Sequence, residues 1–318
     1  PATWGGSPGG VVRRLGWLEQ AFPGGQPRIE WHFFKGAGPA VNEALANRQV
    51  DFAWQGDLPS VVGRSNGLRT RILMASGVRN NLYVAAATDS PVRSIADLAG
   101  RRVAIFRGTN GHLVARRILA DVGMTERDLR LVSLDPATAR TALAARGIEA
   151  AFLGWDAFTL SNSGVARIVF STQGRSPRLT RQAHLHARES FVESWPETTQ
   201  RVVDVFVRAA AWASDESRRE ELFDLWADSG VPRSSFVAEF DGQSLADRNS
   251  PLLDEFILAR YNAVARDALE MKLIARRVTV EDWLDRRFLD SALRRQDLHA
   301  RWSSFDATGT VRGQPAVA

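Results

Sequence analysis

A glycine-rich turn near the start of the chain carries the first groups suited to binding an anion. Residues 5–10 read Gly-Gly-Ser-Pro-Gly-Gly and precede an apolar pattern typical of a helix. Glycines such as Gly6 let backbone amides turn outward, and a helix N-terminus carries a partial positive charge. Ser7 adds a hydroxyl donor. The turn is either a simple chain reversal or part of an anion site, in which Gly6 and Ser7 would contact the ligand.

A second turn of this kind spans residues 107–112 and joins a strand pattern to a helix pattern. We expect free amides at the helix start, among them that of Gly108, to converge with the Thr109 hydroxyl and the guanidinium of Arg107. Such donors suit reversible binding of a fully ionised tetrahedral anion. From chemistry alone, this turn is the best anion-binding candidate in the sequence.

Two further turns place polar or aromatic side chains after strand patterns. Gln55 and Asp57 follow one strand, and Asp57 is predicted to cap the N-terminus of the next helix. Trp155 and Asp156 follow another strand, where the indole is either a core residue or an apolar wall of a ligand site. Ligands of α/β sheets bind beyond the carboxyl ends of the strands, so all four residues are candidates for ligand contact.

The residues required for common catalytic and metal sites do not occur together. The chain contains no cysteine, which excludes thiolate catalysis, disulfides and cysteine-ligated metals. Residues 107–111 lack the lysine of a phosphate-binding P-loop, and Ser7 lies in no Gly-x-Ser-x-Gly sequence. His184 and His186 share one strand face, but no third metal ligand stands near them in the sequence. We therefore expect a binding protein without cofactor or metal, not an enzyme.

The elements that position these turns alternate between strand and helix through the first half of the chain. Strand patterns occur at residues 29–34, 50–54, 71–75, 82–87, 102–106, 130–134, 150–153 and 166–170, and helix patterns at 40–47, 112–122 and 136–146. This alternation predicts an α/β fold with mainly parallel sheets and helices on both faces. After residue 194 helices dominate, at 218–227, 252–275 and 280–293.

Two lobes are expected from this order of elements. Lobe I comprises residues 1–87 together with 186–318, and lobe II comprises residues 88–185, because the chain is predicted to cross between lobes near 82–88 and 184–188. The helical C-terminal part then returns to lobe I. The predicted fold is an α/β clamshell with two lobes.

Composition and charge exclude other classes of protein. Lysine and arginine number 41 against 36 aspartate and glutamate, a formal net charge of +5. Lys35 and Lys272 are the only lysines, and the arginines lie in scattered pairs near acids, so the sequence has no basic stripe for nucleic acid. No stretch approaches the ~20 apolar residues of a membrane span. The first residues lack a basic start and an apolar segment, and we expect the sequence to be a mature or trimmed form.

Five segments together resemble the periplasmic aliphatic-sulfonate, taurine and nitrate binding proteins of ABC importers, over about residues 4–212. The segments are Gly16–Glu19 before Phe22-Pro23, Asp51–Ala53 with Gly56–Pro59, Ser94–Ala104, Gly108–Asn110 with His112, and Ala150–Phe152 with Trp155-Asp156. The resemblance implies a type II periplasmic-binding-protein clamshell that captures a small sulfonate-type anion between its lobes. It also implies a periplasmic location, an ABC transporter permease as partner, and a monomer that binds no nucleic acid.

The resemblance further implies which residues surround the ligand. These are Ser7, Gln55, Asp57, Thr109, His112 and Trp155, with Asn81 and Arg181 on stretches that face the cleft. The chain departs from the family at the first turn, where Gly5-Gly6-Ser7 stands in place of the common Gln-Lys-Ser. It departs again at Arg107, where lysine is common. The smaller first turn and the added arginines suggest a larger anion, or one held at two points.

Two other functions remain open from the sequence. The fold also resembles that of the biphenyl sulfinate desulfinase, and Trp283 with residues 288–293 is similar to its C-terminal segment. The catalytic cysteine of that enzyme would fall on Ser7-Pro8 and its arginine on Ala53, which argues against a desulfinase-like C–S lyase. The other alternative is a binder of a small organic solute such as a thiamine-pyrimidine precursor, with ligand stacking on Trp4 or Trp155.

Overall fold

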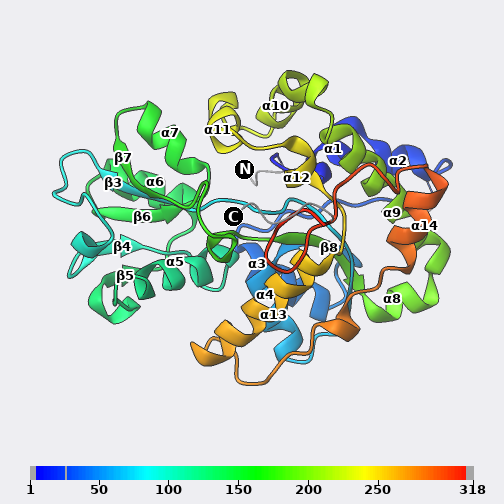
Figure 1. The fold of residues 1–318 in the computed structure, drawn as a ribbon, viewed down its shortest axis with the longest axis horizontal. Helices are drawn as coiled ribbons and strands as arrows, with labels where there is room; N and C mark the ends of the chain where they lie inside the picture. The colour runs from blue at the N-terminus through cyan, green and yellow to red at the C-terminus, as the bar shows by residue number, and fades with distance from the viewer. Residues whose placement is uncertain (1–4, 26, 313–318) are drawn as a thin grey trace. The chain divides into compact units, whose positions relative to one another are not determined.

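Two structural units make up the chain, and a computed structural model describes residues 5–25 and 27–312 of it (Figure 1). Unit 1 consists of Pro1–Val78, Gln182–Gly230 and Gly242–Ala318, and unit 2 of Arg79–Arg181 and Val231–Asp241. The chain therefore passes from one unit to the other four times. Each unit contains its own β-sheet.

Unit 2 is built on a five-stranded sheet with the strand order β5-β4-β6-β3-β7. The strands are β3 (Tyr83–Ala87), β4 (Arg102–Ala104), β5 (Arg130–Val132), β6 (Ala150–Leu153) and β7 (Ala166–Ser171). β4 pairs in parallel with β5 and β6, whereas β3 pairs antiparallel with β6 and β7. The carboxyl ends of β4 and β6 therefore lie beside the amino end of β3. We call this side of the sheet its carboxyl edge.

Alternating side chains of β3 fill two apolar layers on opposite faces of this sheet. Val84 and Ala86 pack into the layer that includes residues of α5 (Asn110–Ala120). Tyr83 and Ala85 pack into the other layer, with residues of α6 (Pro136–Ala144) and α7 (Asp156–Asn162). Figure 1 shows α6 and α7 on one face of the sheet and α5 on the other. The helices fix the turns that precede them at the carboxyl edge.

The division into units differs from the predicted lobes at three places. Residues 182–185 were predicted to lie in lobe II but belong to unit 1, because the strand that begins at Ala183 pairs with two strands of that unit. β3 belongs to unit 2, although residues up to 87 were predicted to lie in lobe I, because its ladder partners are β6 and β7. A segment of the C-terminal half, Val231–Asp241, also belongs to unit 2. Its helix α11 (Arg233–Glu239) packs against α7. No sequence pattern indicated that this segment leaves the helical part of the chain.

Unit 1 holds a three-stranded sheet in the order β1-β8-β2. The central strand β8 (Ala183–Arg188) pairs antiparallel with both β1 (Phe52–Gly56) and β2 (Thr70–Ala75). The helices of the unit are α1 (Pro8–Leu15), α2 (Trp17–Ala21), α3 (Ala37–Ala46), α4 (Asp57–Ser65), α8 (Glu189–Ser194), α9 (Pro196–Ala213), α10 (Arg219–Ala227), α12 (Leu245–Asn249), α13 (Glu255–Glu270) and α14 (Arg287–Arg295). The long helix α9 buries an apolar stripe against α1, α2 and α14.

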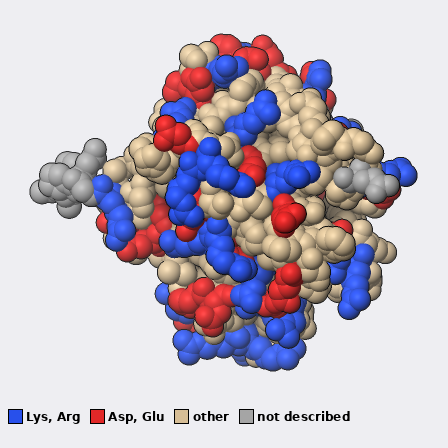
Figure 2. All heavy atoms as spheres, turned by 90° about the vertical axis from the view of Figure 1, so that its right-hand side faces the viewer, with Lys and Arg blue, Asp and Glu red and all other residues tan. Residues whose placement is uncertain are grey.

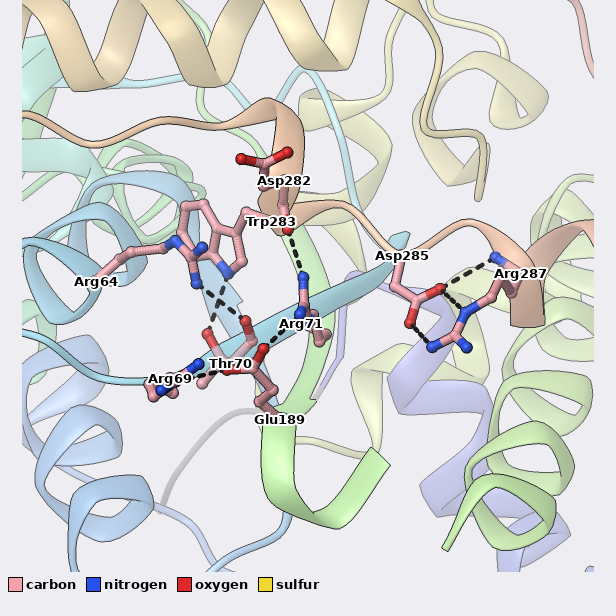
Figure 3. A network of polar contacts seen from close by, with 9 residues as sticks. All are labelled: Arg64, Arg69, Thr70, Arg71, Glu189, Asp282, Trp283, Asp285 and Arg287. Carbon is pink, nitrogen blue, oxygen red and sulfur yellow. Dashed lines mark hydrogen bonds and ion pairs between the residues drawn. The ribbon is translucent and has the colours of Figure 1, made fainter. Parts of the chain in front are cut away.

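A C-terminal segment covers the outer edge of this sheet (Figure 3). Leu284 forms a parallel bridge with Ile72 of β2, and the Asp285 amide donates to the Ile72 carbonyl at 2.8 Å. Trp283 Nε1 donates to Thr70 Oγ1 at 3.1 Å. These bonds satisfy polar groups of a strand that would otherwise be an open edge.

Charged side chains fix the same segment to β2 and α8 (Figure 3). Glu189 accepts from Arg69 Nε at 2.8 Å and from Arg71, which also donates to the Asp282 carbonyl at 2.5 Å. Asp285 accepts from Arg287 Nε at 2.9 Å and Nη2 at 2.6 Å. Burial raises the pKa of Asp285, yet the bonds from Arg287 outweigh it and lower that pKa overall. The bonds of Glu189 and Arg71 join residues that are distant in the sequence, whereas the Asp285–Arg287 pair lies within the segment.

Four predicted features differ from the structure. The helix predicted over 280–293 is interrupted, because Leu284 bridges to Ile72 and α14 begins only at Arg287. Residues 29–34 form no strand, because no described strand lies beside them to complete a ladder. Both sheets contain antiparallel pairs, since β8 and β3 run against their neighbours. The helix predicted over 252–275 spans Glu255–Glu270, because Asp254 caps its start and Lys272 leaves the helical conformation with a φ of 57°.

Surface charges of both signs occur on the face that Figure 2 shows, which is the side of unit 1 that carries α2, α9 and α14 in Figure 1. Basic groups extend across its middle, and acidic groups lie among and around them. Ion pairs such as Arg14–Asp228 and Arg295–Asp204, each at 2.6 Å, neutralise some of these arginines. Within the described residues, no helix has the length and hydropathy that a bilayer span requires.

Candidate functional site

Predicted site residues of unit 2 lie at the carboxyl edge of its sheet. β4 and β6 are parallel neighbours, so the turns that follow them leave the sheet side by side. Tyr83 of β3 pairs with Leu153 at the end of β6, which brings Asn81 to the same edge. A Cβ placed on Gly111 would lie 3.4 Å from Leu82 Cδ1, so the start of α5 also contacts this edge.

The turn 107–112 uses two of its donors internally. The Gly108 amide donates to His112 Nδ1 at 3.2 Å, and the Thr109 hydroxyl donates to the Phe106 carbonyl at 2.7 Å. The amides of residues 109–111 start α5 and have no acceptor within the helix, and no hydrogen bond from them is found in the described chain. These three amides are the donors that the turn offers to an anion.

Arg107 and His112 share one acid. Glu126 Oε1 lies 3.0 Å from His112 Nε2 and 3.6 Å from Arg107 Nε. Since His112 Nδ1 accepts the Gly108 amide, the neutral ring donates from Nε2 to Glu126. Burial lowers the pKa of His112, and Glu126 only partly opposes this effect. The Arg107 side chain is 57% exposed, so its guanidinium reaches solvent as the positive group of this turn.

Asn81, Arg181 and Trp155 form one connected group. The Asn81 carbonyl accepts from Arg181 Nη2. A Cβ placed on Gly154 would lie 3.2 Å from the same nitrogen, so the glycine leaves room for the guanidinium. Trp155 follows this glycine and packs on Phe236 of α11, with ring centroids 5.5 Å apart. The structure therefore brings a predicted cation and a predicted aromatic wall to the carboxyl edge.

Asp156 is the first residue of α7 and a largely buried acid. Its Oδ1 lies 3.4 Å from Arg140 Nη1. Burial raises the pKa of Asp156 above its ordinary value, and Arg140 opposes the shift. A carboxylate at a helix N-terminus interacts favourably with the helix dipole. Its charge disfavours a neighbouring anion, so these contacts support a structural role better than ligand contact.

In unit 1, the first turn contains a buried hydroxyl. Ser7 stands at the N-cap of α1, is 1% exposed, and its side chain makes no capping bond. Among the residues that the structure describes, Ser7 Oγ has no hydrogen-bond partner. Its carbonyl accepts from Trp226 Nε1 at 3.1 Å, which fixes the turn against α10, and Gly6 has a φ of 81° that favours glycine. A buried hydroxyl without a partner costs about 1–3 kcal/mol, so a ligand oxygen would be a favourable partner.

Gln55 holds the second turn of unit 1 together. Its Nε2 donates to the Gly38 carbonyl at 2.7 Å and to Asn42 Oδ1 at 3.0 Å. Its Oε1 accepts from Ser60 Oγ at 2.7 Å. The side chain is 4% exposed, and these bonds join α3 to the turn between β1 and α4. Protein atoms therefore take up most of its bonding capacity.

Asp57 forms two hydrogen bonds with Gln182, the residue before β8. Its amide donates to the Gln182 carbonyl at 2.9 Å, and its Oδ2 accepts from the Gln182 amide at 2.9 Å. The N-cap of α4 is Gly56, so the prediction that Asp57 is the capping residue was wrong. The reason is that Asp57 already has helical geometry and directs one carboxylate oxygen to Gln182.

Two buried histidines lie side by side on β8. His184 and His186 are 0% and 1% exposed, and their ring centroids are 4.8 Å apart. His184 Nδ1 bonds to the Tyr261 hydroxyl, whereas neither ring nitrogen of His186 has a partner in the described part of the chain. Burial lowers the pKa of both rings, that of His186 to about 3. No group of three or more side chains suited to a metal occurs among the described residues.

A surface groove of unit 1, of about 610 Å³, lies away from all of these residues. Its lining consists of Arg71, Leu258, Glu281, Leu284, Asp285, Arg286, Arg287 and Asp290. None of the predicted site residues lines it, and its charges are mixed in sign. The predicted turns, not this groove, remain the candidate ligand site.

Three residues that support the carboxyl edge were not identified from the sequence. Phe236 packs on Trp155, and Glu239 and Tyr83 bond to each other beside Asn81. Phe236 and Glu239 lie on α11, whose return to unit 2 has no local signal. Trp4, the other predicted stacking residue, lies outside the described residues.

Comparisons with known proteins place the chain among binding proteins. Residues 33–219, more than half of the chain, match the family described as NMT1/THI5 like. A Bacillus subtilis (strain 168) protein named as an aliphatic sulfonates-binding protein is 24% identical over 285 residues, which cover 89% of this chain and 84% of the relative.

Solved structures with the same fold extend over nearly the whole chain. The periplasmic sulfonate-binding protein SsuA from Methylobacillus flagellatus KT matches with a TM-score of 0.77 at 25% identity, covering 92% of each chain. The alkanesulfonate-binding protein SsuA from Xanthomonas axonopodis pv. citri, bound to MOPS, matches with 0.72 at 25% identity, covering 87% of this chain and 93% of that one. The desulfurization enzyme DSZB matches with 0.67 at 21% identity, over 90% and 96%, and therefore shares the fold alone.

Proposed function

Because this chain belongs to the NMT1/THI5-like family and is similar over most of its length to sulfonate-binding proteins, we propose that it is the solute-binding protein of an ABC importer. Its ligand is a small organic anion of the sulfonate class. A sulfonate is fully ionised at neutral pH and presents three oxygens that accept hydrogen bonds. Neutral hydroxyl and amide donors bind such a group without a proton transfer.

The observation that carries this proposal is the Ser7 hydroxyl. It is buried at the N-terminus of α1 and has no hydrogen-bond partner among the described residues. An α-helix of eight residues also leaves its first amides without intrahelical acceptors. A sulfonate oxygen at this position would satisfy the hydroxyl and interact with the positive end of the helix dipole.

The amides of residues 109–111 are the corresponding donors of unit 2. They begin the 11-residue helix α5, and Arg107 adds a solvent-accessible positive charge beside them. Trp155 offers an apolar surface at the same edge, suited to the carbon chain of an organic sulfonate. We infer that the ligand set of unit 2 includes these amides, Arg107, Trp155 and Arg181.

The contacts of Ser7 also support binding over catalysis. A serine nucleophile requires a base within hydrogen-bond distance, and the described residues place none beside the Ser7 hydroxyl. The chain has no cysteine to act in its place. The desulfurization enzyme therefore shares the fold, whereas the chemistry of a C–S lyase has no support in these residues.

A periplasmic location and an ABC transporter permease as partner complete the proposal. The Methylobacillus flagellatus relative is described as a periplasmic protein of a sulfonate ABC transporter. An importer of this type requires that the binding protein deliver its ligand to a permease. We propose that the chain acts as a monomer in this role.

Isothermal titration of the purified protein with a panel of small molecules tests the proposed function. The panel contains alkyl sulfonates, taurine, an aryl sulfonate, sulfate, nitrate and formylaminopyrimidine. We expect one molecule of an organic sulfonate to bind per chain, and weaker binding or none for the others. At 100 times its Kd the sulfonate should stabilise the fold by about 2.7 kcal/mol, measured as a higher melting temperature.

Three results would contradict the proposal. Preferential binding of formylaminopyrimidine would support the thiamine-precursor alternative. Release of sulfite from an aryl sulfinate, at a rate that depends on protein concentration, would support the desulfinase alternative. Absence of binding for every anion would reject the anion site altogether.

A further inference from the structure

A buried carboxylate that no sequence motif identified bonds to Asn81, whose carbonyl accepts from the proposed ligand residue Arg181. Glu239 is the last residue of α11 and is 0% exposed. Its Oε1 accepts from both the main-chain and side-chain nitrogens of Asn81, each at 3.1 Å. Its Oε2 accepts from the Tyr83 hydroxyl at 2.6 Å. A buried carboxylate is costly unless it is paired in this way, so the contacts with Asn81 and Tyr83 define its role.

The two bonds to one carboxylate oxygen fix Asn81 more firmly than a single bond would. The main-chain bond holds the backbone at the entry to β3, and the side-chain bond sets the orientation of the amide. Asn81 is itself 2% exposed. Its carbonyl, in turn, accepts from Arg181 Nη2. A continuous chain of contacts thus runs from Glu239 through Asn81 to the Arg181 guanidinium.

α11 brings a second support to the same edge. Phe236, one turn before Glu239, is buried and packs on Trp155. Gln173 anchors the segment from the side of β7, since its Nε2 donates to the carbonyls of Ala238 and Asp241, each at 3.1 Å. The segment is therefore fixed on unit 2 independently of the bonds from Glu239 to Asn81.

We propose that Glu239 is the positioning residue of the ligand-binding edge of unit 2: it holds Asn81, and through Asn81 it orients Arg181. The inference rests on the proposed function, because Arg181 is a ligand residue only under that proposal. Glu239 does not touch the ligand. Its removal should therefore weaken sulfonate binding without removing any ligand contact directly.

Two variants of Glu239 and one matched control test the inference. Glu239→Ala removes the acceptor of the bonds from Asn81 and Tyr83, and Glu239→Gln retains an acceptor oxygen for Asn81. Gln173→Ala loosens the anchoring of the same segment from its other side and leaves Asn81 untouched. We expect sulfonate affinity to fall about tenfold or more in Glu239→Ala. We expect it to stay within about threefold of wild type in Glu239→Gln and in Gln173→Ala.

A measurement without ligand separates this inference from the proposed function. Amide hydrogen exchange at Asn81, followed by NMR, should accelerate in Glu239→Ala and remain slow in Glu239→Gln. If the wild-type protein binds no sulfonate, the proposed function fails, and the exchange rates still decide whether Glu239 holds Asn81. If Glu239→Ala does not fold, Glu239→Asp withdraws the carboxylate by one methylene and should show the same loss.

Three outcomes would overturn the inference. The first is unchanged exchange at Asn81 in Glu239→Ala or Glu239→Asp. The second is unchanged sulfonate affinity in these variants while the wild type binds. The third is an equal loss of affinity in Gln173→Ala, which would assign the effect to docking of the whole segment.

Discussion

Replacement of Ser7 by alanine should change stability and affinity in opposite directions. Ser7 is 1% exposed, and within the described residues its hydroxyl lacks a partner. The free protein therefore carries a polar group that has lost water and gained no bond. Alanine removes that group and keeps the backbone, including the bond from Trp226 to the residue 7 carbonyl. The same change removes a donor from the proposed sulfonate site.

The magnitudes follow from these contacts. An unsatisfied buried hydroxyl costs about 1–3 kcal/mol, and part of the gain on its removal is offset by the small void left behind. We expect the free Ser7→Ala protein to be about 1 kcal/mol more stable, a rise of roughly 1–2 °C in melting temperature. A hydrogen bond to a charged group contributes about 1.5–3 kcal/mol, so sulfonate affinity should fall by roughly 10- to 150-fold.

Urea unfolding and isothermal titration of the same preparations measure both effects. Ser229→Ala is the matched control, because the Ser229 hydroxyl is also buried and without a partner in the described chain, at the end of α10. It should gain stability with no change in affinity. A Ser7→Ala protein that is less stable than wild type would show that the hydroxyl is bonded in the free state. Unchanged affinity would remove Ser7 from the ligand site.

Three further predictions concern the fold around the site. Burial lowers the pKa of His186 to about 3 and also lowers that of His184. Below about pH 6.5 the unfolded chain therefore binds more protons at these two rings than the folded chain does. The free energy of unfolding should therefore fall as pH drops from about 6.5 towards 3, by up to about 1.4 kcal/mol per pH unit for each ring. Urea unfolding at several pH values measures this dependence, and His186→Leu should make it less steep. Gly38→Ala should destabilise unit 1 by about 2 kcal/mol or more in urea unfolding, since its Cβ would lie 2.3 Å from Pro59 Cβ; wild-type stability would refute this packing. Gly9→Ala should instead raise stability by about 0.5–1 kcal/mol, because the new Cβ meets its nearest neighbours at 3.5 Å within a helix, and a loss would contradict that geometry.

The positions of the candidate ligand turns followed from local sequence patterns. Apolar runs ended at polar, glycine-bearing turns, and the structure places the turns at 107–112 and 154–156 beside each other at the carboxyl edge of the unit 2 sheet. Strand and helix periods are local properties, so these elements were recognisable. Strand direction is not local: β3 and β8 run antiparallel to their neighbours, and nothing within their own residues specified this.

Which donors are available to a ligand could not be predicted from residue types. Thr109 has the right side chain, but its hydroxyl bonds to the carbonyl of Phe106. Gln55 and Asp57 stand in the expected turn, yet protein atoms occupy most of their polar groups. Such pairing depends on backbone geometry within a few tenths of an ångström, which a sequence does not reveal.

Contacts between residues distant in the sequence were the other feature that could not be predicted. Glu239 bonds to Asn81 across 158 residues, from a helix that the sequence analysis assigned to lobe I and that belongs to unit 2. Residues 29–34 show the opposite case, because their alternating pattern predicts a strand although no described partner strand lies beside them. Both results arise because a strand or a buried acid is stabilised by its partner, and the partner is specified elsewhere in the chain.

A crystal structure of the protein with a bound alkyl sulfonate would show whether Ser7 contacts the ligand. We expect a sulfonate oxygen within hydrogen-bond distance, about 2.7 Å, of Ser7 Oγ. A sulfonate found instead in the groove beside Arg286, with Ser7 Oγ still unpaired or bonded to water, would contradict this expectation.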